Sequence, residues 1–299
     1  IVSEGKKEVE RIMDRLESPY KLGLQTNELV IPSKDIAGLL RGQVKDDIKS
    51  EWYNRLVYGD NLLVMQALLA GDEESGLPSM RGKIDLIYID PPFDSKADYR
   101  TKIKLPNGDI EQKPSLIEQF AYSDTWKEGT VSYLKMMYPR LVLMRELLSE
   151  QGTIYVHIDW HIGHYIKLLM DDVFGKDKIR NEIIWCYTAA SNTKIDFPRK
   201  HDTIFRYVKN SENFIFNADE IRIPYAEGSI DRANRNVIPR EGMKFNQIVL
   251  NENGKIPEDW WIDIQRATRY PNEPVGYDTQ KPIKLIERLI KASSNENSI

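Results

Sequence analysis

The chain has 299 residues, of which 41% are hydrophobic and 29% charged, as in a folded protein that buries its core without cross-links. Its 42 basic and 46 acidic residues give a net charge of −4, which excludes a histone-like polycation but allows a local basic face for nucleic acid. The single cysteine, Cys186, excludes a disulfide framework and fits a reducing cytoplasm, and no apolar run reaches the roughly 18 residues that would span a membrane.

Two short helices are expected near the N-terminus. Val9, Ile12, Met13 and Leu16 recur at the three-to-four-residue spacing that places apolar side chains on one face of a helix. A second such pattern covers residues 33–49. We therefore interpret residues 1–50 as an N-terminal helical arm.

An alternation of strands and helices begins after Trp52. Strands are predicted at 54–58, 84–89, 153–158, 183–187 and 203–208, with another beginning at 214–216, and helices at 62–69, 131–148, 161–174 and 282–292. A long polar loop over 94–127 contains Asn107-Gly108, a signal for a hairpin turn. The alternation predicts an α/β fold with a largely parallel sheet and helices on both faces.

Regular periodicity weakens between Asn217 and the helix that begins near Pro282. Asn, Arg, Pro and Gly interrupt this stretch repeatedly. We predict a catalytic α/β domain over 51–216, a small inserted domain over 217–275, and a further segment over 276–299.

The tetrapeptide Asp90-Pro91-Pro92-Phe93 carries the strongest chemical signal. It directly follows the apolar run Ile84–Ile89, and because proline cannot continue a central strand, the strand must end at Asp90. Asp90 is therefore expected at the carboxyl end of a buried strand, the edge where ligands bind in α/β sheets.

This corner suits a planar ring that bears an amino group. The Asp90 carboxylate and the Pro91 carbonyl would accept both N–H bonds, which favours a pyramidal nitrogen whose lone pair can attack in line. The Phe93 ring would stack on a base flipped out of a duplex.

With these pieces in order, the chain resembles the amino-group DNA methyltransferases that use S-adenosylmethionine, in particular the beta-ordered group that includes modification subunits of type III restriction systems. The matching segments, which spread over about residues 54–292, are Tyr58-Gly59-Asp60-Asn61, Asp90-Pro91-Pro92-Phe93, Tyr155-Val156-His157-Ile158-Asp159, Arg180-Asn181-Glu182-Ile183-Ile184-Trp185, Phe197-Pro198-Arg199-Lys200-His201-Asp202 and Thr279-Gln280-Lys281-Pro282.

The resemblance implies a Rossmann-like methyltransferase fold with a circularly permuted motif order. It implies that Asp90, Pro91, Pro92 and Phe93 form the catalytic loop, and that Thr279, Gln280 and Lys281 line the methionine end of S-adenosylmethionine. Asp60 and Asn61 are similar to the family's Gly-Asp turn and are further candidates for cofactor contact. Residues 217–275 would be the target recognition domain.

Two departures from the family pattern affect these expectations. Asp94 stands where the family usually has asparagine after the tetrapeptide. The family's glycine loop, an aromatic-x-Gly-x-Gly strand end, is expected directly after the Thr279-Gln280-Lys281 helix, where this sequence reaches Ile299. We therefore expect a chain truncated before that loop, inactive or weak in cofactor binding when alone; micromolar affinity in calorimetry would contradict this.

Local clusters of basic residues fit a DNA partner, because Lys and Arg grip phosphates without reading sequence. They gather in residues 194–210 and 232–244, and beside Trp260 and Trp261. The candidate DNA-binding residues are Lys194, Arg199, Lys200, Arg232, Arg235, Arg240, Arg266 and Arg269.

The leading hypothesis is a site-specific DNA methyltransferase that modifies the exocyclic N6 of adenine within a restriction-modification system. Aspartate at the head of the tetrapeptide favours adenine within the family, and cytosine N4 and an RNA substrate stay as alternatives. The resemblance further implies double-stranded DNA, a restriction subunit and a second copy of the chain as partners.

Two hypotheses from other classes remain. His157, His161 and His164 could form the centre of a metal-dependent hydrolase, although their spacing matches no metal motif and we expect no metal. The second of these hypotheses is a non-catalytic DNA-recognition subunit, which the absence of the cofactor-binding glycine loop from this sequence allows.

Overall fold

The computed structural model describes residues 1–18, 56–57, 59–71, 78–92, 101–105, 108–112, 129–191, 193–228, 250–277 and 279–299. These form two compact units, residues 1–83 with 94–147 and residues 84–93 with 148–299. The helix predicted at 33–49 lies outside the described residues, as does most of the strand predicted at 54–58. The described part of that strand, Leu56-Val57, has no strand structure and is exposed. Within these ranges no helix is long and apolar enough to cross a membrane.

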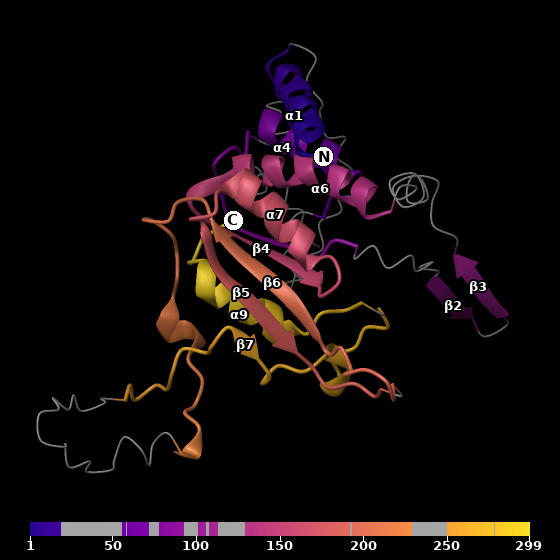
Figure 1. Ribbon diagram of the computed structural model, residues 1–299, viewed down its shortest axis with the longest axis vertical. Helices are drawn as coiled ribbons and strands as arrows, with labels where there is room; N and C mark the ends of the chain where they lie inside the picture. The colour runs from indigo at the N-terminus through magenta and orange to yellow at the C-terminus, as the bar shows by residue number, and fades with distance from the viewer. Residues whose placement is uncertain are drawn as a thin grey trace, which may run out of the picture. The chain divides into compact units, whose positions relative to one another are not determined.

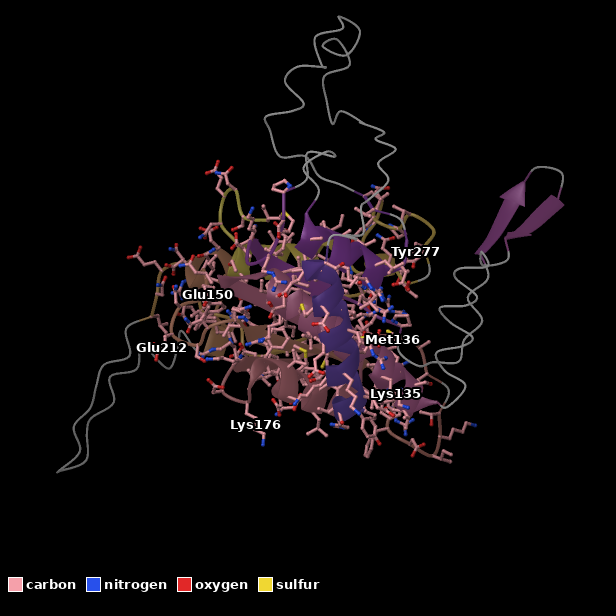
Figure 2. All side chains as sticks on the ribbon, turned by 90° about the horizontal axis from the view of Figure 1, so that it is seen from above. Lys135, Met136, Glu150, Lys176, Glu212 and Tyr277 are labelled. Carbon is pink, nitrogen blue, oxygen red and sulfur yellow. The ribbon has the colours of Figure 1, made fainter. Side chains whose placement is uncertain are left out.

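Among the residues that the structure describes, the first unit contains the helices α1 (Val2–Glu17), α4 (Asn61–Ala70) and α6 (Thr130–Leu147), with α1 and α4 both packed on α6. The predicted apolar stripe of α1 is confirmed: Ile12 is buried, while Val9, Met13 and Leu16 are half-buried. Lys135 of α6 pairs with Glu4 of α1 at 3.2 Å, and Figure 2 shows Lys135 beside that helix.

At Gly5, α1 packs closely against α6. A Cβ atom at this position would lie 2.3 Å from Cδ1 of Tyr138, which is itself buried. Glycine normally weakens a helix, so its presence here is explained by the tight contact.

We therefore expect Gly5→Ala to destabilise the docking of α1 by about 1–3 kcal/mol, because the overpacking outweighs the gain in helix propensity. Hydrogen exchange of the α1 amides measures the effect directly. Lys7→Ala, an exposed substitution on the same helix, serves as the control and is expected to leave exchange unchanged. Slower exchange in the Gly5 variant would contradict the close-packing explanation.

The long loop predicted over 94–127 contains two short strands, β2 (Thr101–Leu105) and β3 (Gly108–Gln112). They pair antiparallel, with Leu105 opposite Gly108, so only two residues connect them. This confirms the hairpin signal of Asn107-Gly108, although Asn107 itself lies outside the described residues.

The second unit holds a five-stranded sheet in the order β1-β4-β6-β5-β7. The strands are β1 (Ile84–Ile89), β4 (Leu148–Asp159), β5 (Ile179–Cys186), β6 (His201–Val208) and β7 (Trp260–Trp261). β1 runs parallel to β4 and β5 parallel to β7, but β6 is antiparallel to both β4 and β5. The prediction of a largely parallel sheet is therefore wrong. Only a loop joins β5 to β6, and because a parallel pair would need a longer crossover connection, the two strands run antiparallel.

Helices cover both faces of this sheet, as predicted. α7 (Gly163–Phe174) lies on one face, where Phe174 packs against Tyr207 and Asp171 accepts a 2.7 Å hydrogen bond from the Tyr207 hydroxyl. α9 (Ile283–Ser293) lies on the other, where Leu285 and Leu289 belong to the same buried cluster as Trp185. The two helices are visible on either side of β6 in Figure 1. Alternating residues of β6 supply the two cores.

β1 is half-buried along its whole length, and not fully buried as predicted. β1 is at the end of the sheet order, so only one of its two edges pairs with another strand of the sheet, β4. Along the other edge, the backbone amides of Asp85 and Leu86 donate to the carbonyl of Ile299 at 2.7 and 3.1 Å. Asp90 follows this strand directly.

The strand predicted to begin at Phe214 does not form, and that prediction is wrong. The guanidinium carbon of Arg206 lies 5.4 Å from the centre of the Phe214 ring and 4.5 Å from that of Phe216. Burying the cationic side chain of Arg206 between these rings replaces strand pairing here. These residues line a cavity of about 350 Å³ at the end of β6 remote from His201.

The inserted domain predicted over 217–275 is described at its two flanks. They contain the short helices η1 (Ala218–Ile221) and η2 (Ala267–Arg269), and an isolated bridge joins Ile223 to Lys255. β7 and Ile264 belong to the sheet and its core. The boundaries of the insertion stay a prediction.

Candidate active site

Asp90 begins the segment that leaves the sheet at the carboxyl end of β1. Ile89 pairs with Val156 of β4, so Asp90 comes at the level of His157, and Pro91 and Pro92 carry the chain away from the strand. The predicted position of Asp90 at this edge is confirmed. Phe93, the fourth residue of the tetrapeptide, lies outside the described residues.

The Asp90 carboxylate is paired with Lys281. The ammonium group of Lys281 donates to Oδ2 of Asp90, and the two side chains are only 14% and 24% exposed. A partly buried ion pair is screened less than a surface pair. The structure thus joins a predicted catalytic residue to a predicted cofactor-binding residue 191 positions later in the chain.

The segment before Lys281 is folded tightly by its own side chains. The Gln280 amide donates to the carbonyl of Glu273 at 3.0 Å and accepts from the backbone amide of Val275 at 2.9 Å. The Glu273 carboxylate accepts a 2.7 Å bond from the amide of Ile283, in the first turn of α9. Gln280 therefore holds the turn in place, while Thr279 remains exposed.

Next to Asp90, buried and half-buried polar side chains form a hydrogen-bonded chain on the α9 face of the sheet. The Tyr88 hydroxyl lies 2.8 Å from Nδ1 of His157, and Nε2 of His157 lies 3.1 Å from Oδ2 of Asp202. The Tyr187 hydroxyl donates to the other Asp202 oxygen at 3.2 Å. His157 is fully buried and meets the Trp185 ring edge-on. This network fixes the end of β1 from beneath.

Burial raises the pKa of Tyr88 well above its ordinary value of 10, and the nearby Asp90 and Asp202 carboxylates raise it further. The folded protein therefore keeps this proton at pH values where the unfolded chain releases it. It follows that Tyr88 adds stability below pH 10 which is lost as the pH rises further.

Above pH 10, the unfolding free energy of the wild-type protein falls as the pH rises. We expect this slope to be smaller in Tyr88→Phe by about 1.4 kcal/mol per pH unit. Urea unfolding of both proteins between pH 9 and pH 12 gives the two slopes. Tyr187 and Tyr207, whose pKa values burial also raises, remain in the variant and keep a residual slope. Equal slopes in the two proteins would contradict the buried position of Tyr88.

Asp60 and Asn61, the other cofactor candidates, lie in the first compact unit. Oδ1 of Asp60 accepts from the amides of Leu62 and Leu63 at 2.8 and 3.3 Å, so Asp60 caps the start of α4. Arg140 of α6 bonds to both side chains, at 3.4 Å from Oδ2 of Asp60 and 2.5 Å from Oδ1 of Asn61. Cofactor contact by Asp60 and Asn61 stays a prediction.

The three histidines of the hydrolase hypothesis have different surroundings. Both ring nitrogens of His157 are bonded within the buried network. His161 contacts Asp159 at 3.3 Å, and His164 is exposed on α7. Among the described residues, no group of three or more His, Cys, Asp or Glu side chains could hold a metal ion. This geometry gives the hydrolase hypothesis no support.

Most of the candidate DNA-binding residues that the structure describes lie on or beside the loop between β5 and β6. Lys194 and Arg199 are exposed on this loop, and Lys200 donates to the carbonyl of Ala190 at 3.1 Å. Arg266 lies over the Tyr187 ring at the base of the loop, and Arg269 is exposed nearby in sequence. Arg232, Arg235 and Arg240 lie outside the described residues.

Residues 84–299 match the model of the N6/N4 DNA methylase family, which is well over half of the chain. The chain belongs to the DNA methylase family. This confirms the resemblance inferred from the motifs. The mixed sheet with helices on both faces agrees with the α/β architecture that the resemblance implied.

Several curated DNA methylases are similar to this chain. The Mod subunit of the type III restriction-modification enzyme EcoP15I from Escherichia coli is 29% identical over 171 residues, covering 54% of this chain and 25% of that protein. The type II methyltransferase M.HpaI of Haemophilus parainfluenzae is 26% identical, covering 78% and 62%. The DNA adenine methyltransferase YhdJ of Escherichia coli K12 is 25% identical, covering 78% and 69%. The methylase chain thus spans between a quarter and about two thirds of these relatives.

Proposed function

We propose that this DNA methylase transfers a methyl group from S-adenosylmethionine to the exocyclic N6 of an adenine in double-stranded DNA, as part of a restriction-modification system. The observation that carries the proposal is the Asp90 carboxylate at the carboxyl edge of β1, paired with Lys281 and followed by two prolines. Family membership supports the methylation of DNA. The names of YhdJ and of the EcoP15I Mod subunit support adenine and restriction-modification respectively.

The corner at Asp90 offers two acceptors to an amino group. Oδ2 of Asp90 accepts from Lys281, so we assign Oδ1 to one N–H bond of the base and the Pro91 carbonyl to the other. Accepting both bonds localises the nitrogen lone pair and aims it at the methyl carbon. Asp90 and Pro91 would thus hold the amino nitrogen for methyl transfer. S-adenosylmethionine would supply the methyl group with its sulfur as the leaving group, and the nitrogen would then give up its proton to water.

The residues at the start of α9 fit the methionine end of the proposed cofactor. S-adenosylmethionine supplies, when bound, a methyl group on a positively charged sulfur. The partly buried ammonium of Lys281 suits a carboxylate, and the exposed hydroxyl of Thr279 can add a hydrogen bond. The Gln280 side chain, by contrast, is occupied in holding the turn that presents them.

DNA would approach the edge of the sheet at which Asp90 lies. We assign the phosphate contacts to Lys194, Arg199, Lys200 and Arg266 on and beside the β5–β6 loop, to Arg269, and to Arg232, Arg235 and Arg240 in the proposed recognition insertion over 217–275. A restriction subunit and a second copy of the chain are the proposed protein partners. A DNA substrate and a single cysteine fit a cytoplasmic location.

The test is product analysis after incubation of the protein, expressed from its whole gene, with labelled S-adenosylmethionine and duplex DNA. The proposal predicts labelled N6-methyladenine in the nucleosides of digested DNA. Labelled N4-methylcytosine would show that the target base is cytosine and not adenine. Label found in RNA alone would contradict the proposal that DNA is the substrate. Absence of label in any nucleic acid would contradict the proposed function.

A further inference from the structure

The loop that joins β5 to β6 exposes two large apolar side chains. Residues 187–200, which we call the hairpin loop, leave the sheet beyond the arrowhead of β5 in Figure 1. Phe197 is 96% exposed and Ile195 is 92% exposed. Single exposed apolar residues need no explanation, but an almost bare aromatic ring among cations suggests a partner that buries it.

The hairpin loop leaves the sheet at the same edge as the catalytic corner. Asp159, the last residue of β4, pairs with Asp202 at the start of β6, and β1 runs parallel to β4. The end of β1 and the start of β6 are therefore separated by one strand, β4, which corresponds to about 10 Å across the sheet.

The surroundings of Phe197 are basic. Arg199 stacks its guanidinium carbon 4.5 Å from the centre of the exposed Trp160 ring, which follows β4. Lys194 and Lys200 flank the ring along the chain, and Asp196 is the acidic residue among them. Three cations against one carboxylate match the phosphates on either side of a nucleotide.

We propose that Phe197 enters the base stack of the DNA at the position that the target base leaves, while Arg199 and Lys200 hold the neighbouring phosphates. Apolar side chains that insert at base steps offset the cost of unstacking, and a base must leave the helix to reach the Asp90 corner. This inference rests on the proposed function and assigns to Phe197 the positioning of the substrate.

The test compares Phe197→Ala with wild-type protein on two duplexes of the recognised sequence. One is fully paired, and the other lacks the base opposite the target, so that the target leaves the stack easily. Phe197→Ala is expected to lower methylation of the paired duplex, and the fluorescence rise of 2-aminopurine at the target position, by about tenfold or more. On the second duplex the loss is expected to shrink to within about twofold of wild type, as flipping no longer limits the rate.

Ile195→Ala is the matched control, because Ile195 is as exposed as Phe197 on the same loop. It is expected to behave as wild type on both duplexes, and Phe197→Leu to retain part of the activity. Wild-type behaviour of Phe197→Ala on the paired duplex would overturn the proposal, and so would an equal loss on both duplexes.

Two further outcomes would overturn it in recognisable ways. If Phe197→Ala changes the sedimentation of the protein and leaves both methylation rates unchanged, the ring contacts another protein copy. If wild-type protein methylates neither duplex, the proposed function itself fails, and the role of Phe197 fails with it.

Discussion

Replacement of Asp90 by alanine is expected to lower the turnover number for methyl transfer by about a thousandfold, since it removes an acceptor aimed at the reacting amine. The fold is expected to survive, because Asp90 lies beyond the end of β1 and is not part of the sheet or its core. Affinity for DNA is expected to change little. Single-turnover kinetics with labelled S-adenosylmethionine separate the loss of chemistry from any loss of binding.

Two further variants sharpen this result. Asp90→Asn keeps one carbonyl oxygen at the corner but loses the charge that pairs with Lys281, and its rate is expected to lie between those of wild type and Asp90→Ala. Asp85→Asn alters a carboxylate on the same strand that accepts a 2.6 Å bond from Ser149, and its rate is expected to match wild type. A normal rate for Asp90→Ala would remove Asp90 from the reaction.

Replacement of His157 by alanine is expected to reduce the free energy of unfolding by about 4 kcal/mol. Both ring nitrogens of this fully buried side chain are bonded, so the variant strands the Tyr88 hydroxyl and the Asp202 carboxylate and leaves a cavity beside Trp185. Urea denaturation at neutral pH measures the loss.

His164→Ala is the control for this experiment, because His164 is exposed on α7; its effect is expected to stay within about 0.5 kcal/mol. In a double-mutant cycle, Asp202→Asn is expected to cost less in the His157→Ala background than in wild type, since the two side chains share a hydrogen bond. A His157→Ala protein of unchanged stability that has lost a bound metal would instead favour the hydrolase hypothesis.

Local patterns in the sequence predicted most of the individual elements. The apolar spacing of α7 and α9 and the termination of β1 by Pro91 each depend on neighbouring residues. The same is true of the position of Asp90, which follows from the two prolines alone.

What the sequence did not predict depends on contacts between distant segments. The pairing of Lys281 with Asp90 joins residues 191 positions apart, and Asp202 reaches His157 across 45 positions. The direction of β6 was missed because an apolar run has the same pattern in parallel and antiparallel strands. One signal was available: no helical pattern separates Cys186 from His201, which excludes a crossover.

The apolar residues Phe214 and Phe216 were mistaken for a strand because aromatic residues favour strands. Their rings contact Arg206, a charged residue on β6 that is 4% exposed. Among the described residues, no carboxylate is paired with Arg206, and the two aromatic rings contact its cationic group instead. This contact could be inferred only once the position of β6 in the sheet was known.

The role of the Asp90 corner can be tested by a crystal structure of the protein with a duplex of its recognised sequence and a cofactor analogue that cannot donate a methyl group. We expect an adenine outside the helix, with its amino nitrogen about 3 Å from Oδ1 of Asp90 and from the carbonyl oxygen of Pro91. An adenine that stays stacked in the duplex, or an Asp90 corner filled by protein side chains in the complex, would contradict it.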